Sequence, residues 1–85
     1  MILVDPPMYH DSQRTKLRYE WWSHMVSDLS VDELHDFAHR LGLKRSWFQP
    51  RKHLPHYDIT ANKREQAIRL GAVPVSSRDL VQRSI

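Results

Sequence analysis

The sequence predicts a small α/β domain of two or three layers, with about three short strands and three helices in a single domain over residues 1–85. Short apolar runs alternate along the chain with amphipathic segments, which is the order typical of α/β proteins. The amphipathic segments begin and end at recognisable helix caps. A chain of 85 residues is also too short for a second domain with its own core.

Three segments are predicted to be strands. Residues 2–4 are apolar and end at Asp5, which two prolines follow. Residues 21–27 are rich in aromatic and β-branched side chains, and residues 73–75 form a short run whose central proline favours a sheet edge. If the first two strands are parallel, Asp5 and Asp28 both lie at the carboxyl edge of the sheet, where ligands tend to bind.

Three helices are predicted from their caps. The first begins at a capping box formed by Ser30 and Glu33, and it ends at Gly42. The second spans about 60–70 and the third spans 77–83, each starting after a hydroxyl side chain that can cap it. The first helix carries apolar side chains at helical spacing, namely Val31, Leu34, Phe37, Ala38 and Leu41.

The remaining segments are predicted to be irregular. Residues 10–20 are mostly polar and charged, and we expect a loop with a helical turn. Residues 43–58 contain Pro50 and Pro55 and are predicted to form a long connection, of the kind that often carries function.

The composition restricts the class of protein. There are no cysteines, so disulfides and thiolate zinc sites are excluded. The longest apolar run, residues 1–4, is shorter than the ~7 residues that a secretory signal needs and far shorter than a membrane span. We therefore expect a soluble cytoplasmic protein with no membrane partner.

The protein is mildly basic, and its charged residues are unevenly distributed along the chain. The formal net charge is +3 and the pI is near 9.6. Residues 44–53 contain lysines and arginines but no acid, whereas residues 28–36 are acidic. This asymmetry favours an anionic partner for one face, and the alternative is an ordinary solvated surface.

The most informative polar side chains lie in and around residues 55–60. Asp5, His24, His56 and Asp58 supply two imidazoles and two carboxylates, which can hold Zn²⁺ or Mn²⁺ or act as an acid–base pair. We predict His24, His56 and Asp58 as catalytic residues and all four as metal ligands. The alternative is that His56 and Asp58 only stabilise a turn. Only the fold can bring these distant segments together.

Neighbouring side chains are predicted to bind the ligand. Lys63 and Arg64 lie near the start of a helix, where cations and free amides can hold a phosphate. The basic and aromatic segment 44–53 can neutralise phosphates and stack on bases. The alternative is that Trp47 and Phe48 pack in the core. The predicted ligand-binding side chains are Tyr57, Lys63, Arg64, Trp47 and Gln49.

Two further patterns involve histidines and tryptophans. His35 and His39 are spaced i, i+4 like the histidines of zinc proteases. Asp36 replaces the expected glutamate, however, and polar pairs at this spacing are common on solvated helix faces. Of Trp21 and Trp22, one is expected to be buried and the other to line a groove.

Several short motifs, in this order and at close spacing, resemble the family named domain of unknown function 4031. They are Val4-Asp5, His24-Met25-Val26-Ser27-Asp28, Glu33-Leu34-His35-Asp36-Phe37-Ala38, Leu41-Gly42-Leu43, Trp47-Phe48-Gln49, His56-Tyr57-Asp58-Ile59, Lys63-Arg64 and Leu70-Gly71-Ala72-Val73. The resemblance covers nearly the whole chain and is loosest before residue 23. It implies a cytoplasmic protein of bacterial or phage origin and implies no activity.

The sequence supports two functional hypotheses. The first is a domain that binds a phosphate-bearing ligand or nucleic acid at a His/Asp/Lys site, with metal-assisted phosphoester hydrolysis as its enzymatic form and Zn²⁺ or Mn²⁺ as cofactor. The second is a non-catalytic phage or bacterial protein that docks on a host protein through exposed aromatic side chains.

Overall fold

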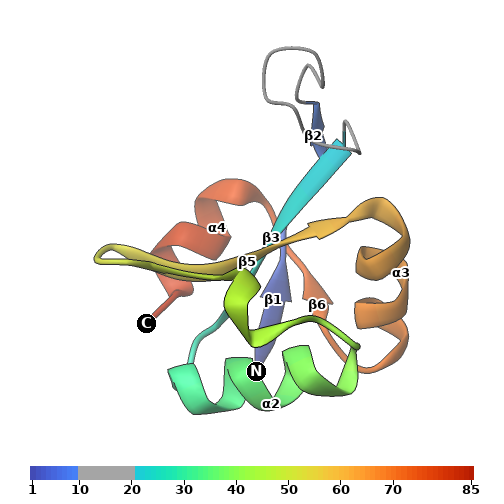
Figure 1. Cartoon of the computed structure of the whole chain (residues 1–85). Coiled ribbons are helices and arrows are strands. Elements are labelled where there is room, and N and C mark those ends of the chain that lie inside the picture. The colour runs from blue at the N-terminus through green and yellow to red at the C-terminus, as the bar shows by residue number, and fades with distance from the viewer. Residues whose placement is uncertain (10–20) are drawn as a thin grey trace.

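The structure, a computed structural model, describes residues 1–9 and 21–85. Within these residues, one mixed sheet of six strands has the order β4-β5-β3-β1-β6, and β2 pairs with the end of β3 (Figure 1). The predicted α/β class agrees with this fold, but the prediction of about three short strands is wrong. The loop expected over 10–20 lies outside the described residues. The strands are β1 (Ile2–Val4), β2 (Met8–Tyr9), β3 (Trp21–Ser27), β4 (Phe48–Arg51), β5 (Leu54–Thr60) and β6 (Val73–Pro74).

β1 and β3, which correspond to the first two predicted strands, are antiparallel, and this corrects the expectation for Asp5 and Asp28. Ile2 pairs with Ser27 and Val4 with Met25, whereas only β6 runs parallel to β1. Asp5 and Asp28 therefore lie at opposite ends of the pair. The apolar pattern indicates which face of a sheet a side chain takes, but it carries no information on strand direction.

The segment 43–58 is not a long connection, because most of it forms the β4–β5 hairpin. The strands are joined by a two-residue turn, and Pro50 pairs with Pro55. Both prolines are tolerated because neither has to donate to a central ladder. β4 is an edge strand, and the pairing of β5 with β3 ends at Tyr57, before Pro55.

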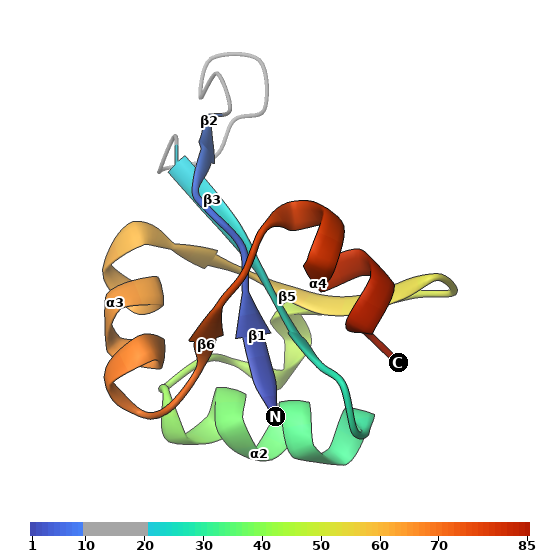
Figure 2. The same ribbon diagram turned by 180° about the vertical axis from the view of Figure 1, so that it is seen from behind.

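Helices cover both faces of the sheet, which gives three layers (Figures 1 and 2). α2 (Val31–Arg40) and α3 (Ala61–Arg69) pack on one face, around Met25, Tyr57 and Ile59. α4 (Ser77–Arg83) packs on the other face, where Leu80 contacts a smaller cluster of apolar side chains. A short 3₁₀ turn, η1 (Arg45–Trp47), precedes β4. No helix in the described residues is long and apolar enough to cross a membrane.

The predicted caps form, with one difference. The hydroxyls of Ser30, Thr60 and Ser76 each accept a hydrogen bond from an amide three residues later. Gly42 adopts a φ of 85°, which is left-handed and favours glycine. Glu33 was expected to reach back to the amide of Ser30, but that amide donates to the Ser27 hydroxyl instead, at 3.1 Å.

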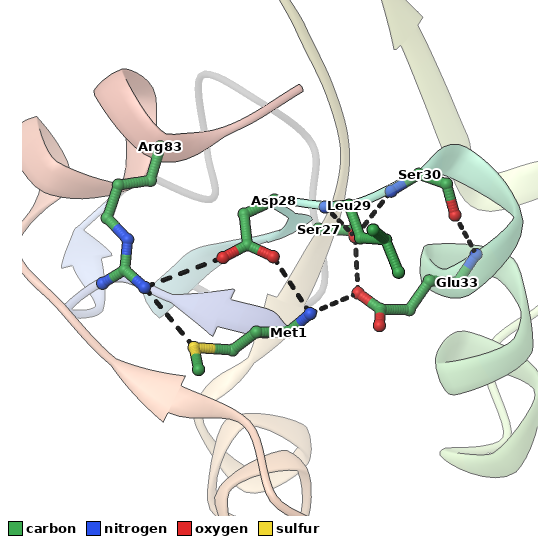
Figure 3. A network of polar contacts seen from close by, with 7 residues as sticks. All are labelled: Met1, Ser27, Asp28, Leu29, Ser30, Glu33 and Arg83. Carbon is green, nitrogen blue, oxygen red and sulfur yellow. Dashed lines mark hydrogen bonds and ion pairs between the residues drawn. The ribbon is translucent and has the colours of Figure 1, made fainter.

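Ser27 is the centre of the polar network that fixes the start of α2 (Figure 3). Its buried hydroxyl donates to Glu33 at 2.6 Å and accepts from the amides of Leu29 and Ser30 at 2.9 and 3.1 Å. Glu33 also accepts from the amino group of Met1 at 2.7 Å. The hydrogen bond from the Met1 amino group holds the pKa of Glu33 below its ordinary value, and the hydrogen bond from Ser27 contributes less to the same shift.

Ser27→Ala is expected to lower the free energy of unfolding by about 1–3 kcal/mol, because it leaves two backbone amides and a carboxylate without their shared partner. Urea denaturation measures this change. Ser46→Ala, at an exposed serine of η1, is the control and should leave the midpoint unchanged. Equal midpoints for the two variants would contradict the role of Ser27.

Candidate metal centre

Three potential metal ligands converge on one face of the sheet. His24 of β3 lies directly opposite Asp58 of β5, and His56 precedes Asp58 by two residues, so all three side chains share a face. One ligand atom from each lies within 4.8 Å of the others. The two imidazole rings meet edge to face with their centroids 5.1 Å apart.

The spacing is close to that of a bound ion. Donor atoms at about 2.1 Å from one tetrahedral metal lie about 3.4 Å from one another. The Nε2 atom of His56 is already 3.4 Å from Oδ1 of Asp58. All three donors lie within 4.8 Å of one another, so side-chain rotations that shorten the longer separations would let them hold one ion.

Each of the three side chains is also held by a group outside the three. His24 Nδ1 lies 2.8 Å from a carboxylate oxygen of Asp5, and His56 Nδ1 lies 2.6 Å from the carbonyl oxygen of Leu54. A carboxylate oxygen and a carbonyl oxygen accept hydrogen bonds, so each of these contacts suits a ring that carries a proton on Nδ1. Nε2 is then the nitrogen through which either ring could coordinate a metal ion. Gln49 donates its side-chain amide to Oδ2 of Asp58 at 2.8 Å.

Asp5 lies behind His24 and supports it. Asp5 is 1% exposed, and its Oδ1 accepts from the His24 amide at 2.7 Å. Oδ2 accepts from the His24 ring and from the Ser77 hydroxyl, the latter at 3.3 Å. The structure therefore places Asp5, which the sequence suggested as a fourth ligand, outside the group of three. The hydrogen bond to Asp5 raises the pKa of His24 above its ordinary value, although burial opposes the shift.

The three side chains lie in the wall of a pocket of about 1220 Å³. α4 packs on the same face of the sheet, against Leu3 and Val26. We refer to the space beside the three candidate ligands as the metal pocket, and Trp22, Trp47, Arg51 and Lys63 also line it.

The two predicted anion-binding cations are engaged with backbone carbonyls. Lys63 donates its Nζ to the carbonyl of Leu41 at 2.8 Å, beyond the end of α2. Arg64 donates its Nε to the carbonyl of Asp5 at 2.8 Å. Lys63 still lines the metal pocket, but these contacts give both side chains a structural role.

Tyr57 faces the opposite side of the sheet from the metal ligands. It is 1% exposed, and its hydroxyl lies 2.8 Å from Nδ1 of His35. Burial lowers the pKa of His35, which favours the neutral ring. His39 is exposed, and the i, i+4 pair forms no metal-binding group in the described part of the chain.

The tryptophans differ from expectation. Neither Trp21 nor Trp22 is fully buried: Trp21 is 52% exposed, and Trp22 is half-buried in the wall of the metal pocket. Trp47 is 49% exposed and lines the same pocket, whereas Phe48 packs on the core. The sequence left open whether Trp47 and Phe48 pack in the core, and of these two only Phe48 does so.

The sequence of β5 contains a signal for the shared face. Leu54, His56, Asp58 and Thr60 alternate with Pro55, Tyr57 and Ile59. In a strand this alternation places His56 and Asp58 on one face and Tyr57 and Ile59 on the other. The supporting roles of Asp5 and the Leu54 carbonyl have no such signal.

Asp5→Asn is expected to lower the pKa of His24 toward its ordinary value, since the bond to Asp5 is the largest cause of the shift. In the metal-free protein, the raised pKa means that the pair stabilises the fold below about pH 6.5. This stabilisation is lost as the pH rises through the folded-state pKa. An NMR titration of the His24 ring measures the shift, with Asp32→Asn on the exposed face of α2 as control. An unchanged His24 titration in Asp5→Asn would refute the assignment.

Comparison with known proteins identifies the family. The chain matches no curated protein and no solved structure. The model of the family described as protein of unknown function DUF4031 matches residues 2–85. This match confirms the resemblance seen in the sequence motifs, and the chain belongs to the DUF4031 family.

Proposed function

We propose that the protein binds one divalent transition-metal ion and uses it to hydrolyse phosphoesters. The ligands are Nε2 of His24, Nε2 of His56 and a carboxylate oxygen of Asp58. The observation that carries this proposal is that all three donors converge while a different protein group orients each of them. Outer partners of this kind are typical of metal sites.

The donor set indicates the type of metal and of site. Two imidazoles and one carboxylate suit Zn²⁺ or Mn²⁺. Catalytic zinc sites commonly have three protein ligands and an open position for water, whereas structural sites use four. The open position here would face the metal pocket. A metal ion held by these three residues would lower the pKa of a bound water and would polarise a phosphoryl oxygen.

The charge of the pocket favours an anionic substrate. Among the described residues, Asp58 is the only carboxylate that lines it, whereas Arg51 and Lys63 bring positive charge. A divalent ion would add two further positive charges, and Asp5 behind His24 would offset one of them. The resulting excess of positive charge supports the phosphate part of the proposal.

Calorimetric titration with Zn²⁺ and Mn²⁺ tests the metal centre. The unmodified protein should bind one ion, and His56→Gln, which keeps most of the side-chain volume, should weaken binding at least about 100-fold. His53→Gln, at an exposed histidine of the hairpin turn, should bind like the unmodified protein. The rate of bis(p-nitrophenyl) phosphate hydrolysis should fall in His56→Gln and should stay unchanged in His53→Gln. Equal affinities for both variants would exclude the proposed ligands.

A separate group of exposed side chains favours a second function, docking on another protein. Met8, Tyr9 and Trp21 are 39%, 56% and 52% exposed, and the rings of Tyr9 and Trp21 meet edge to face at 5.5 Å. They lie where β2 and β3 project from the body of the domain (Figure 1). Large aromatic side chains are common anchors of protein interfaces.

The docking function predicts that Trp21→Ser loses a stoichiometric partner in affinity capture, because it removes the largest of these exposed side chains. His56→Gln should retain that partner while losing the metal. A partner lost from both variants, or retained by both, would argue against docking through the β2–β3 projection.

A further inference from the structure

The metal pocket combines metal ligands with tryptophan side chains, which a site for bare phosphate does not require. Trp22 precedes His24 by two residues on β3, so the two side chains share a face and are about 7 Å apart along the strand. Trp22 is paired with Thr60, and on this face of the sheet that pair is the neighbour of the pair formed by His24 and Asp58. An indole therefore lies immediately beside the metal ligands.

Trp47 contributes a second indole from a different element. It ends η1, lines the metal pocket and is 49% exposed. Aromatic rings of this kind stack on nucleobases, because every base has a π-face. The Nζ atom of Lys44 lies 5.7 Å from the centroid of the Trp47 ring, so a cation accompanies this stacking surface.

The dimensions and charge of the pocket agree with a nucleotide. Its volume of about 1220 Å³ exceeds the ~300–1,000 Å³ typical of small-molecule sites, which leaves room for a base, a sugar and a phosphate. Arg51 extends from β4 on the same face as Gln49 and His56 and lines the pocket. A nucleotide with its phosphate at the metal centre and its base against an indole would account for both the metal ligands and the tryptophan side chains.

We propose that the substrate carries a nucleobase, which stacks on Trp47 and Trp22 while its phosphate lies at the metal centre. This inference rests on the proposed metal-dependent function and specifies its substrate class. The same chemistry is present in a free nucleotide and in a single-stranded oligonucleotide, so the experiment has one arm for each.

The test measures affinities of the Mn²⁺-loaded full chain by calorimetry. AMP and ribose 5-phosphate share the sugar and phosphate, and only AMP has a base. AMP should bind at least about 100-fold more tightly, because the base would make two stacking contacts that each contribute about ten-fold. A single-stranded oligothymidylate of about six nucleotides forms the other arm. If it binds more tightly than AMP, the natural substrate is a strand, and if not, it is a free nucleotide.

Tryptophan variants locate the base. Trp47→Leu and Trp22→Leu should each reduce the preference for AMP over ribose 5-phosphate about ten-fold. Trp21→Leu is the matched control, since Trp21 is equally exposed but lies outside the pocket lining, and it should keep the preference. Trp47 does not belong to the central strands, so its variant remains informative if Trp22→Leu unfolds, which circular dichroism would show.

Different results overturn the two proposals. Equal binding of AMP and ribose 5-phosphate, or an equal loss of preference in Trp21→Leu and Trp47→Leu, would overturn the nucleobase site alone. Metal titration of the same samples is independent of either sugar phosphate. If Mn²⁺ and Zn²⁺ both fail to bind the unmodified protein, the metal-dependent function falls, and this inference falls with it.

Discussion

The antiparallel register between β3 and β5 is the constraint on which the candidate site depends. It places His24 opposite Asp58, and it also places Met25 opposite Tyr57 on the other face. Met25 and Tyr57 are almost completely buried under the helices. A shift of one residue would turn Met25 and Tyr57 out of this core, so the packing of the core determines the face on which the three candidate ligands lie.

The site also draws on parts of the chain outside those two strands. Asp5 follows β1 and Gln49 comes from β4, and these two side chains orient His24 and Asp58. His24 and Asp58 therefore need little reorganisation before a ligand binds. Preorganisation of this kind reduces the conformational entropy that binding would otherwise cost.

The local features of this fold were largely readable from the sequence, whereas the long-range features were not. The caps at Ser30 and Thr60 and the left-handed turn at Gly42 depend on neighbouring residues, and the structure contains all three. The β4–β5 hairpin was missed because Pro50 and Pro55 usually interrupt strands, and their acceptability depends on which strands lie beside them. The positions of Asp5 and Lys63 depend on strand direction and helix packing, which a single sequence does not encode locally.

The buried position of Asp5 has a consequence for the thermodynamics of the whole domain. Through its side chain and carbonyl, Asp5 joins His24 to Ser77 of α4 and to Arg64 of α3, which pack on opposite faces of the sheet. An ion held by His24 would therefore reinforce contacts in every layer. Because a ligand that binds only the native state raises the unfolding free energy by mass action, the resistance of this small chain to denaturation would vary with the supply of free metal.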